Sequence, residues 1–293
     1  VNSIILSGNK PLIVDIDKST LCMSVDSILK NLTDDVEAIM WVHMAGLISS
    51  DIIEIKKMCK DRGIYLIEDA AHAHGAYYYD ETHDEILRAG NIGDVGCFSF
   101  YPSKVMATGE GGMITTNNKK FYDKMVSLRN LSFGKKNRFH HDDIGWNYRM
   151  TNMQAAIGYA QLKKLRYFIK KKRKIGNYYS EELQKISDLQ LPVLSNEFSK
   201  NIFWVYSIII KNKNLNAIKL SKDLKKRGIE TRPFFYPMHM QPIIKKLKLI
   251  DKNEKFPVSE KIYRYGLYLP SGIGNTFNEV KEVVKQLKII FKD

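Results

Sequence analysis

One lysine, Lys104, stands in a setting that suits covalent chemistry. It lies in the stretch CFSFYPSKVMATGEGG (97–112), five residues after Ser99 and just before a glycine cluster. A lysine amine attacks a carbonyl only in its uncharged form, and burial or neighbouring charge produces that form by disfavouring the ammonium. Lys104 is therefore a candidate for Schiff-base formation with an aldehyde cofactor.

The stretch YLIEDAAHAHGA (65–76) contains groups that one such cofactor, pyridoxal phosphate, requires. Its ring nitrogen needs a carboxylate, its phosphate needs donors, and its phenolic oxygen needs a hydrogen-bonding neighbour. Asp69, Ser99 and His72 are the candidates for these three roles. Taken singly, each has a more ordinary interpretation, because a strand-end Asp often caps a helix, a Ser forms turns, and His72 or His74 can be a packed core histidine.

Both stretches follow predicted strands. Apolar runs predict strands at 10–17, 36–46, 64–69, 95–100 and 111–117. Helical spacing predicts helices at 25–32 and 50–63, the second with Ser50 and Asp51 at its N-cap and Gly63 as its C-cap. This alternation predicts an α/β fold with a mostly parallel sheet covered by helices on both faces. Ligands of such sheets bind at the carboxyl ends of the strands, where Asp69 and Ser99 lie.

The pattern changes after residue 150. One long helix or two abutting helices are predicted over 151–186, with Thr151 as N-cap. An apolar stripe runs along the first part, formed by Met153, Ala156, Ile157, Ala160, Leu162 and Leu165. A smaller α+β unit follows, with a strand at 203–211, a helix at 216–228, a strand and turn at 229–237, and a last helix at 278–291. We therefore predict two domains, 1–170 and 171–293.

Composition narrows the class of protein. The chain has 293 residues, of which 44% are hydrophobic, enough for one large domain or two ordinary ones. Cys22, Cys59 and Cys97 are not in CxxC pairs, which argues against a disulfide framework or a zinc site and favours the reducing cytoplasm. The cysteine spacing thus leads us to expect no metal site. No apolar run reaches the roughly 18 residues of a membrane helix, so we also expect no membrane span.

The net charge is +14, and part of it lies in the run KKLRYFIKKKRK (163–174). Such a run is typical of a solvated helix face, and a basic surface also suits an anionic substrate such as a sugar nucleotide. A nucleic-acid-binding protein is an alternative. We expect no nucleic-acid partner, because neither a recognised binding motif nor interleaved aromatic and basic residues accompany the run.

Together, the segments EDAAHAHGA (68–76) and GDVGCFSFYPSKVMATGEGGMITTN (93–117) closely resemble the pyridoxal-phosphate-dependent sugar aminotransferases of the DegT/DnrJ/StrS type. The resemblance continues through LRNLSFG (128–134), GWNYRMTNMQAAIGYAQLKKL (145–165), RGIETRPFFYPMHMQP (227–242) and YLPSG (268–272). It implies an aspartate-aminotransferase-like fold, fold type I. This fold has a three-layer αβα large domain, whose N-terminal part we expect to be missing here, and a small C-terminal α+β domain.

The resemblance also implies a role for each candidate residue. Lys104 would bind the cofactor covalently and act as general base and acid, while Asp69 would pair with the ring nitrogen. Ala71 would pack on the ring, and His72 would lie near the phenolic oxygen. Ser99 would bind the phosphate.

Three further residues are implied to lie at the edges of this site. Asn147 would reach the phosphate of the neighbouring subunit, so the resemblance implies a homodimer with shared active sites. Tyr236 and His239 would lie near the substrate entrance.

The implied reaction transfers an amino group from glutamate to a nucleotide-linked keto sugar for surface polysaccharide or O-antigen synthesis. TRPFFYP (231–237), TGEGGMITTN (108–117) and FWVY (203–206) look most like the perosamine-synthase subgroup, which acts at C4 of a 4-keto-6-deoxy sugar. Related dehydratases carry His at the lysine position, so Lys104 argues against that branch.

One departure from the family concerns the start of the chain, which reads VNSIILSG. In relatives, a preceding region supplies a phosphate-binding turn at a helix N-terminus and an aromatic residue that stacks on the ring. We therefore expect the chain to be truncated at the front. A truncated, non-catalytic or regulatory relative is the alternative function.

Overall fold

The computed structural model describes residues 1–134, 139–251 and 253–292. The chain forms two compact units. Unit 1 comprises Val1–Val36, Lys170–Glu197 and Asn201–Asp293, and unit 2 comprises Glu37–Ile169 and Phe198–Lys200. The break after Ile169 coincides with the predicted boundary, whereas residues 1–36 group with the C-terminal residues rather than with the large domain. The functional division into 1–170 and 171–293 stays a prediction.

Hydrogen bonds from helix α9 (Pro257–Tyr265) explain why the N-terminal residues group with unit 1. Phe256 precedes this helix and offers no capping side chain. The carboxylate of Asp15 takes that role by accepting hydrogen bonds from the backbone N–H of Val258 at 2.9 Å and of Ser259 at 3.0 Å. A carboxylate at a helix N-terminus satisfies unpaired N–H groups and complements the helix dipole.

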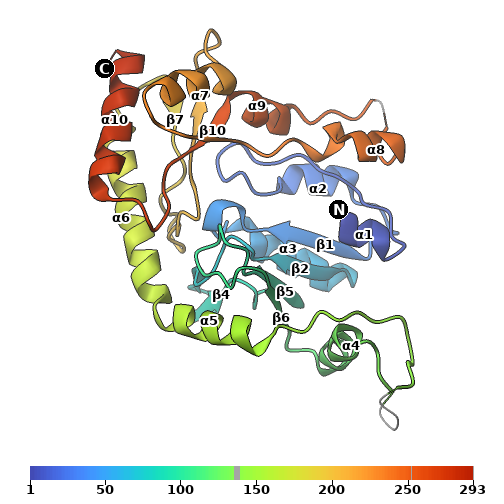
Figure 1. Ribbon diagram of the computed structural model, residues 1–293. Helices are drawn as coiled ribbons and strands as arrows, with labels where there is room; N and C mark the ends of the chain where they lie inside the picture. The colour runs from blue at the N-terminus through green and yellow to red at the C-terminus, as the bar shows by residue number, and fades with distance from the viewer. Residues whose placement is uncertain (135–138, 252, 293) are drawn as a thin grey trace. The chain divides into compact units, whose positions relative to one another are not determined.

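Unit 2 is built on a sheet in the order β1-β2-β5-β6, visible in Figure 1. Its strands are β1 (Ala38–Val42), β2 (Tyr65–Asp69), β5 (Val95–Ser99) and β6 (Gly112–Thr115). The first three are parallel and β6 runs antiparallel to β5, which confirms the mostly parallel α/β sheet. Helix α3 (Asp51–Arg62) connects β1 to β2 and contacts both strands.

Helix α3 begins and ends where the sequence predicts. Gly63 closes the helix in the left-handed conformation, with φ of +68°. Ser50 stands at the N-cap as predicted, but its backbone is itself helical and its side chain makes no capping hydrogen bond. Hydrophobic side chains of α3 are buried in unit 2, among them Ile52, Ile55 and Cys59.

Unit 2 contains further helices and a hairpin. They are η1 (Met44–Gly46), the hairpin strands β3 (Tyr77–Asp80) and β4 (Glu85–Arg88), α4 (Lys119–Arg129) and α5 (Asn152–Lys163). Thr151 caps α5 as predicted, in a reciprocal capping box with Gln154. Every residue of α5 is at least partly exposed, and on its apolar stripe Met153 is 78% exposed.

Unit 1 contains an antiparallel sheet in the order β7-β8-β10-β9. Its strands are β7 (Leu189–Gln190), β8 (Tyr206–Ile210), β9 (Arg232–Pro233) and β10 (Gly266–Leu269). The other helices are α1 (Asn2–Leu6), α2 (Val25–Asn31), α6 (Leu165–Leu183), which begins in unit 2, α7 (Ala217–Lys226), η2 (Met238–Met240), α8 (Pro242–Lys246) and α10 (Phe277–Phe291). These elements agree with the predicted small α+β unit.

The core of unit 1 lies where α6, α7 and α10 meet β8 and β10. It includes Tyr179, Leu220, Ile208, Leu267 and Val283, all nearly or fully buried. Figure 1 shows α6 and α10 side by side. An ion pair between Lys288 Nζ of α10 and Glu182 Oε2 of α6, at 2.7 Å, joins the two helices.

The predicted strand at 10–17 is wrong. Within the described N-terminal residues, this segment forms only an isolated bridge between Ile16 and Met23. Its backbone is instead held by side chains, since Asp15 N donates to Ser27 Oγ at 3.0 Å. The segment is therefore only partly buried, with Leu12 50% exposed, and it has no partner strand among the described residues.

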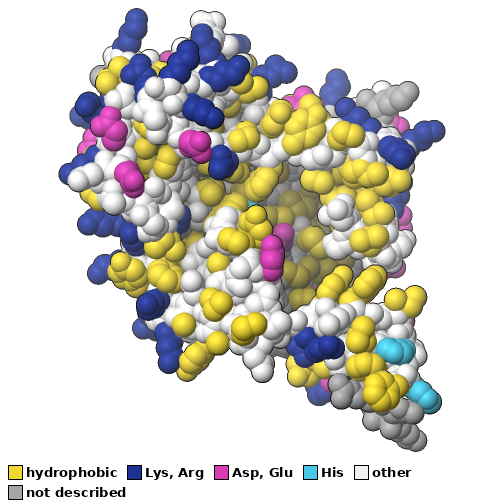
Figure 2. All heavy atoms as spheres, viewed as in Figure 1, with side chains coloured by type: hydrophobic (Ala, Val, Ile, Leu, Met, Phe, Trp, Pro, Cys, Tyr) yellow, Lys and Arg dark blue, Asp and Glu magenta, His cyan; other side chains and the backbone are white. Residues whose placement is uncertain are grey.

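Basic side chains lie mostly on the surface, and Figure 2 shows lysine and arginine spread over one face with fewer acidic residues between them. In the run 163–174, nearly all lysine and arginine side chains are exposed or partly exposed, in line with the predicted solvated helix face. Lys172 is the exception, with 4% exposure. Its Nζ donates to the carbonyl oxygens of Trp204, at 2.8 Å, and of Ser271. Burial lowers the pKa of Lys172 to about 7.

No helix within residues 1–134, 139–251 and 253–292 combines the length and the apolar character needed to cross a bilayer.

Candidate active site

Lys104 lies in the loop that joins β5 to the antiparallel strand β6. Backbone hydrogen bonds close this loop at its base, from Phe100 N to Gly111 O at 2.8 Å and from Thr108 N to Phe100 O at 2.9 Å. Gly111 has φ of +146°, a conformation that side chains rarely adopt. Lys104 N donates to Tyr101 O at 2.9 Å, so the lysine sits in a defined turn just beyond the carboxyl end of β5.

The surroundings of Lys104 favour its reactive form. Lys104 is partly buried, and this burial lowers its pKa, while the negative charge of Asp69 partly opposes the shift. A lysine with a lowered pKa supplies more neutral amine at neutral pH, which Schiff-base chemistry requires.

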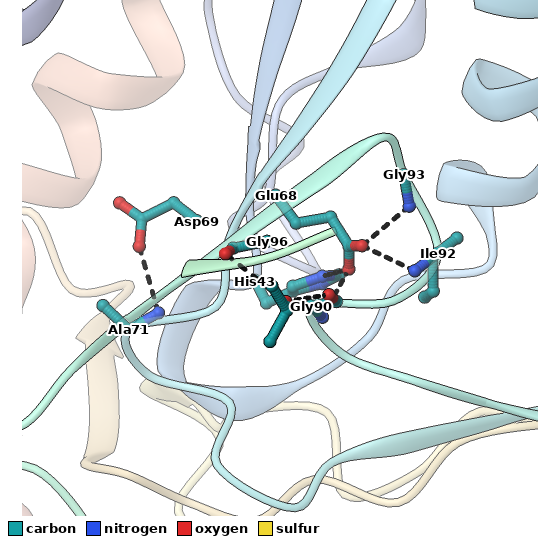
Figure 3. A network of polar contacts seen from close by, with 9 residues as sticks. His43, Glu68, Asp69, Ala71, Gly90, Ile92, Gly93 and Gly96 are labelled. Carbon is teal, nitrogen blue, oxygen red and sulfur yellow. Dashed lines mark hydrogen bonds and ion pairs between the residues drawn. The ribbon is translucent and has the colours of Figure 1, made fainter. Parts of the chain in front are cut away.

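Asp69 is the last residue of β2, paired in the sheet with Val42 on one side and Cys97 on the other. Its Oδ1 accepts a hydrogen bond from Ala71 N at 3.0 Å. The side chain therefore performs the ordinary role of stabilising the turn after the strand, and its negative charge also acts on Lys104. In Figure 3 the Asp69 carboxylate points away from that of Glu68.

Two buried histidines, His72 and His74, are affected by the charge of Lys104. Burial, reinforced by the charge of Lys104, lowers the pKa of His72 to about 3 and that of His74 to about 4. Both imidazoles are therefore neutral at pH 7. His74, which the sequence leaves as a packed residue, lies against Phe98 and Phe100, with ring centroids 5.6 and 5.8 Å away.

The other predicted cofactor residues of this region sit at strand ends. Ser99 ends β5, and its Oγ accepts a hydrogen bond from Tyr101 N at 3.3 Å. Ala71 is partly buried in the turn after β2. Asn147 is exposed and forms an isolated β-bridge with Asn130. Lys104 interacts electrostatically with both Asp69 and His72. The cofactor-binding roles of these three residues, like those of Ser99, Ala71 and Asn147, stay predictions.

The two predicted substrate residues belong to unit 1. The Tyr236 ring meets that of Tyr263 edge to face, with centroids 5.0 Å apart. His239 stacks on Phe256 at 4.3 Å, and its Nε2 lies 3.1 Å from Glu260 Oε1. Their place near a substrate stays a prediction.

A buried network around Glu68 escaped the sequence-based reasoning. Glu68 and His43 are both 0% exposed, and His43 Nε2 lies 2.8 Å from Glu68 Oε2 (Figure 3). Burial would raise the pKa of Glu68, but hydrogen bonds and charge from His43 and bonds from backbone N–H groups hold it below its ordinary value. A glutamate inside an otherwise apolar strand was the available signal, since a buried carboxylate needs partners.

The chemistry of this group of side chains fits pyridoxal phosphate. Lys104 offers an amine with a lowered pKa, Asp69 a carboxylate for a ring nitrogen, and His72 a neutral imidazole. Among the described residues, no cluster of three or more His, Cys, Asp or Glu suited to a metal ion is present.

Comparisons with known proteins agree with this chemistry. The sequence profile of the DegT/DnrJ/EryC1/StrS aminotransferase family matches residues 1–288. The chain is 34% identical to the GDP-perosamine synthase of Escherichia coli O157:H7 over 296 residues, covering 100% of this chain and 76% of the relative. It is 35% identical to the GDP-perosamine synthase of Vibrio cholerae over 295 residues, covering 99% and 76%.

A solved structure shows the same fold. The E. coli GDP-4-keto-6-deoxy-D-mannose-3-dehydratase with bound hydrated PLP superposes with a TM-score of 0.85 at 28% identity, covering 97% of this chain and 76% of that one. The expected fold type I of pyridoxal-phosphate-dependent transferases is thereby confirmed. The chain belongs to the DegT/DnrJ/EryC1/StrS aminotransferase family, whose sugar aminotransferases depend on pyridoxal phosphate.

Proposed function

We propose that this protein transfers an amino group from glutamate to C4 of a nucleotide-linked 4-keto-6-deoxy sugar, for the synthesis of a surface polysaccharide such as O antigen. The single observation that carries the proposal is the partly buried Lys104 in the turn just beyond β5, where the charge of Asp69, the last residue of β2, acts on it. The similarity to GDP-perosamine synthases supports a GDP-linked sugar as the first substrate to test.

The proposed roles divide the work among a few side chains. Pyridoxal phosphate, when bound, supplies an electron sink that stabilises negative charge at a substrate carbon. Asp69 keeps the ring nitrogen protonated, His72 donates to or accepts from the phenolic oxygen, Ser99 binds the phosphate, and Ala71 packs on the ring. Lys104 moves the proton at the reacting carbon as general base and acid.

Lys104 also separates this function from that of the dehydratase branch. The resemblance places histidine at the corresponding position of those dehydratases, and a histidine cannot form a Schiff base with an aldehyde. The lysine therefore supports transamination over dehydration. A cytoplasmic location stays part of the proposal.

The test is a substitution at Lys104. Lys104→Ala is expected to abolish the visible absorbance of lysine-bound pyridoxal phosphate and all turnover of glutamate with the keto sugar. Lys120→Ala, at an exposed lysine of α4 in the same unit, serves as the control and should keep both. Full activity of Lys104→Ala would refute the assignment. A wild type without the visible band would favour the alternative, a non-catalytic or regulatory relative.

We further propose that two copies share their active sites. The exposed apolar residues of α5 and of the segment before it support a covered surface, among them Trp146 and Tyr148, whose rings stack at 5.8 Å. In this arrangement Asn147 of one copy reaches the phosphate in the site of the other.

Mixing two inactive variants tests this arrangement. Each mixed dimer of Lys104→Ala and Asn147→Ala subunits contains one site with both native residues, so mixing should restore turnover. No restoration after verified subunit exchange would contradict shared sites.

A further inference from the structure

Glu68 and Asp69 are consecutive residues of β2 and serve opposite faces of the strand. Successive side chains of a strand point to opposite sides. Figure 3 shows this directly, with Asp69 directed to one side and Glu68 to the other. Asp69 is partly exposed, whereas Glu68 is 0% exposed. Whatever holds Glu68 in place therefore also holds the backbone that carries Asp69.

Four N–H groups surround the Glu68 carboxylate, two for each oxygen. Oε2 accepts from His43 Nε2 and from Gly90 N, both at 2.8 Å. Oε1 accepts from Ile92 N at 2.6 Å and from Gly93 N at 2.7 Å. Hydrogen bonds to an ionised acceptor are short and about twice as strong as those between neutral groups. The carboxylate is thus held at both oxygens and needs no further partner.

His43 forms hydrogen bonds to both Glu68 and Asp69. It follows β1 directly, and while its Nε2 donates to Glu68, its backbone N donates to Asp69 O at 3.1 Å. Because the ionised carboxylate carries no proton, His43 Nε2 is the donor in this contact. One residue at the end of β1 therefore fixes both the side chain of Glu68 and the main chain of Asp69.

The other donors come from the turn before β5, which fits closely against β2. A Cβ on Gly93 would lie 2.4 Å from Leu66 O, and a Cβ on Gly96 would lie 2.3 Å from Gly90 Cα. Gly90 has φ of +83°. Only glycine lets this backbone approach Glu68 so closely. Glu68 thereby joins β2 to the strand that leads to Ser99 and Lys104.

We propose that Glu68, clamped by His43 and the 90–93 turn, is a positioning residue that fixes Asp69 where its carboxylate meets the ring nitrogen of the cofactor. This inference rests on the proposed function. Glu68 touches neither cofactor nor substrate in this account and acts only through the backbone of β2.

Glu68→Gln is the first test. The amide keeps the shape but places an NH₂ group against two of the four N–H donors, so one side of the clamp opens. We expect pyridoxal phosphate, added to the folded apoprotein, to bind on the order of tenfold to a hundredfold more weakly, because small displacements of positioned groups have effects of that size. Glu81→Gln, at an exposed carboxylate in the same unit, is the matched control and should bind as the wild type does.

A second measurement separates positioning from general stability. The positive charge of a protonated ring nitrogen lowers the proton affinity of the Lys104 nitrogen that is joined to the cofactor. If Asp69 is displaced, that charge is lost, and the pH at which the bound chromophore changes colour should rise. A purely structural role for Glu68 would leave this pH unchanged in the folded variant.

A pair of variants at His43 keeps the inference testable even if Glu68→Gln does not fold. His43→Gln retains an N–H donor for Glu68, whereas His43→Leu retains bulk without a donor. We expect His43→Gln to preserve cofactor affinity and chromophore pH better than His43→Leu. The inference would be overturned if the two His43 variants had equal cofactor affinity and chromophore pH, or if folded Glu68→Gln kept the wild-type values. Either result would leave the proposed function standing. Failure of the wild type to bind pyridoxal phosphate would overturn the proposed function as well.

Discussion

The buried lysine of α6 makes the stability of unit 1 depend on pH in a defined direction. Lys172 is almost fully buried, with two carbonyl oxygens as its hydrogen-bond partners and a pKa lowered from 10.5 to about 7. Between these two values the unfolded chain binds a proton that the folded chain has released. The unfolded state then binds more protons, so the free energy of unfolding must rise as the pH rises.

The size of the effect follows from the same numbers. Each pH unit in this window adds up to about 1.4 kcal/mol, so the shift from 10.5 to about 7 corresponds to at most about 5 kcal/mol. The hydrogen bonds to Trp204 and Ser271 favour the charged amine and reduce this limit. The destabilisation is fully present below pH 7 and is relieved as the pH rises toward 10.5.

The assay compares slopes rather than absolute stabilities. Lys172→Met removes the titrating group but also leaves two buried carbonyls without their donor, which costs about 1–3 kcal/mol for each at every pH. Urea denaturation at pH 7, 8 and 9 should therefore show a steeper rise with pH for the wild type than for Lys172→Met. Lys170→Met, an exposed site on the same helix, should keep the wild-type slope. Parallel curves for the wild type and Lys172→Met would refute the reasoning.

Two further predictions concern stability within unit 1. Asp15→Ala should lower the free energy of unfolding by about 1–3 kcal/mol, because the N–H groups of Val258 and Ser259 lose their acceptor; an unchanged urea midpoint would contradict the capping role. Gly176→Ala should cost about 1–3 kcal/mol, because the added Cβ would lie 2.4 Å from the ring of Phe203; a melting temperature equal to that of the wild type would show that α6 can shift away.

Local signals predicted much of the fold because they act within a few residues. Gly63 ends α3 and Thr151 caps α5 through chemistry confined to one turn of helix. A strand, in contrast, exists only if a partner lies beside it. The apolar segment 10–17 has strand-like composition, yet it forms only the bridge from Ile16 to Met23, and nothing in its own residues reveals that.

Some residues of the candidate site could be predicted from their type and position, and others could not because their partners lie far away in the sequence. Lys104 and Asp69 could be predicted because their residue types and their places after strands carry the chemistry. Glu68 gave a signal as a carboxylate within a predicted strand, but its partners could not be predicted, because three of the four are backbone N–H groups, which any residue type supplies. His74 was left as a packed residue, and its burial against Phe98 and Phe100 agrees with that interpretation.

The turn before β5 has a consequence for how this protein tolerates mutation. Gly90, Gly93 and Gly96 bring main chain against main chain or against an aromatic ring, with no volume left for even a methyl group. Saturation mutagenesis of this segment should find those three positions intolerant and the exposed Asn91 permissive. The turn that holds Glu68 is therefore expected to stay fixed in sequence while its exposed neighbours vary.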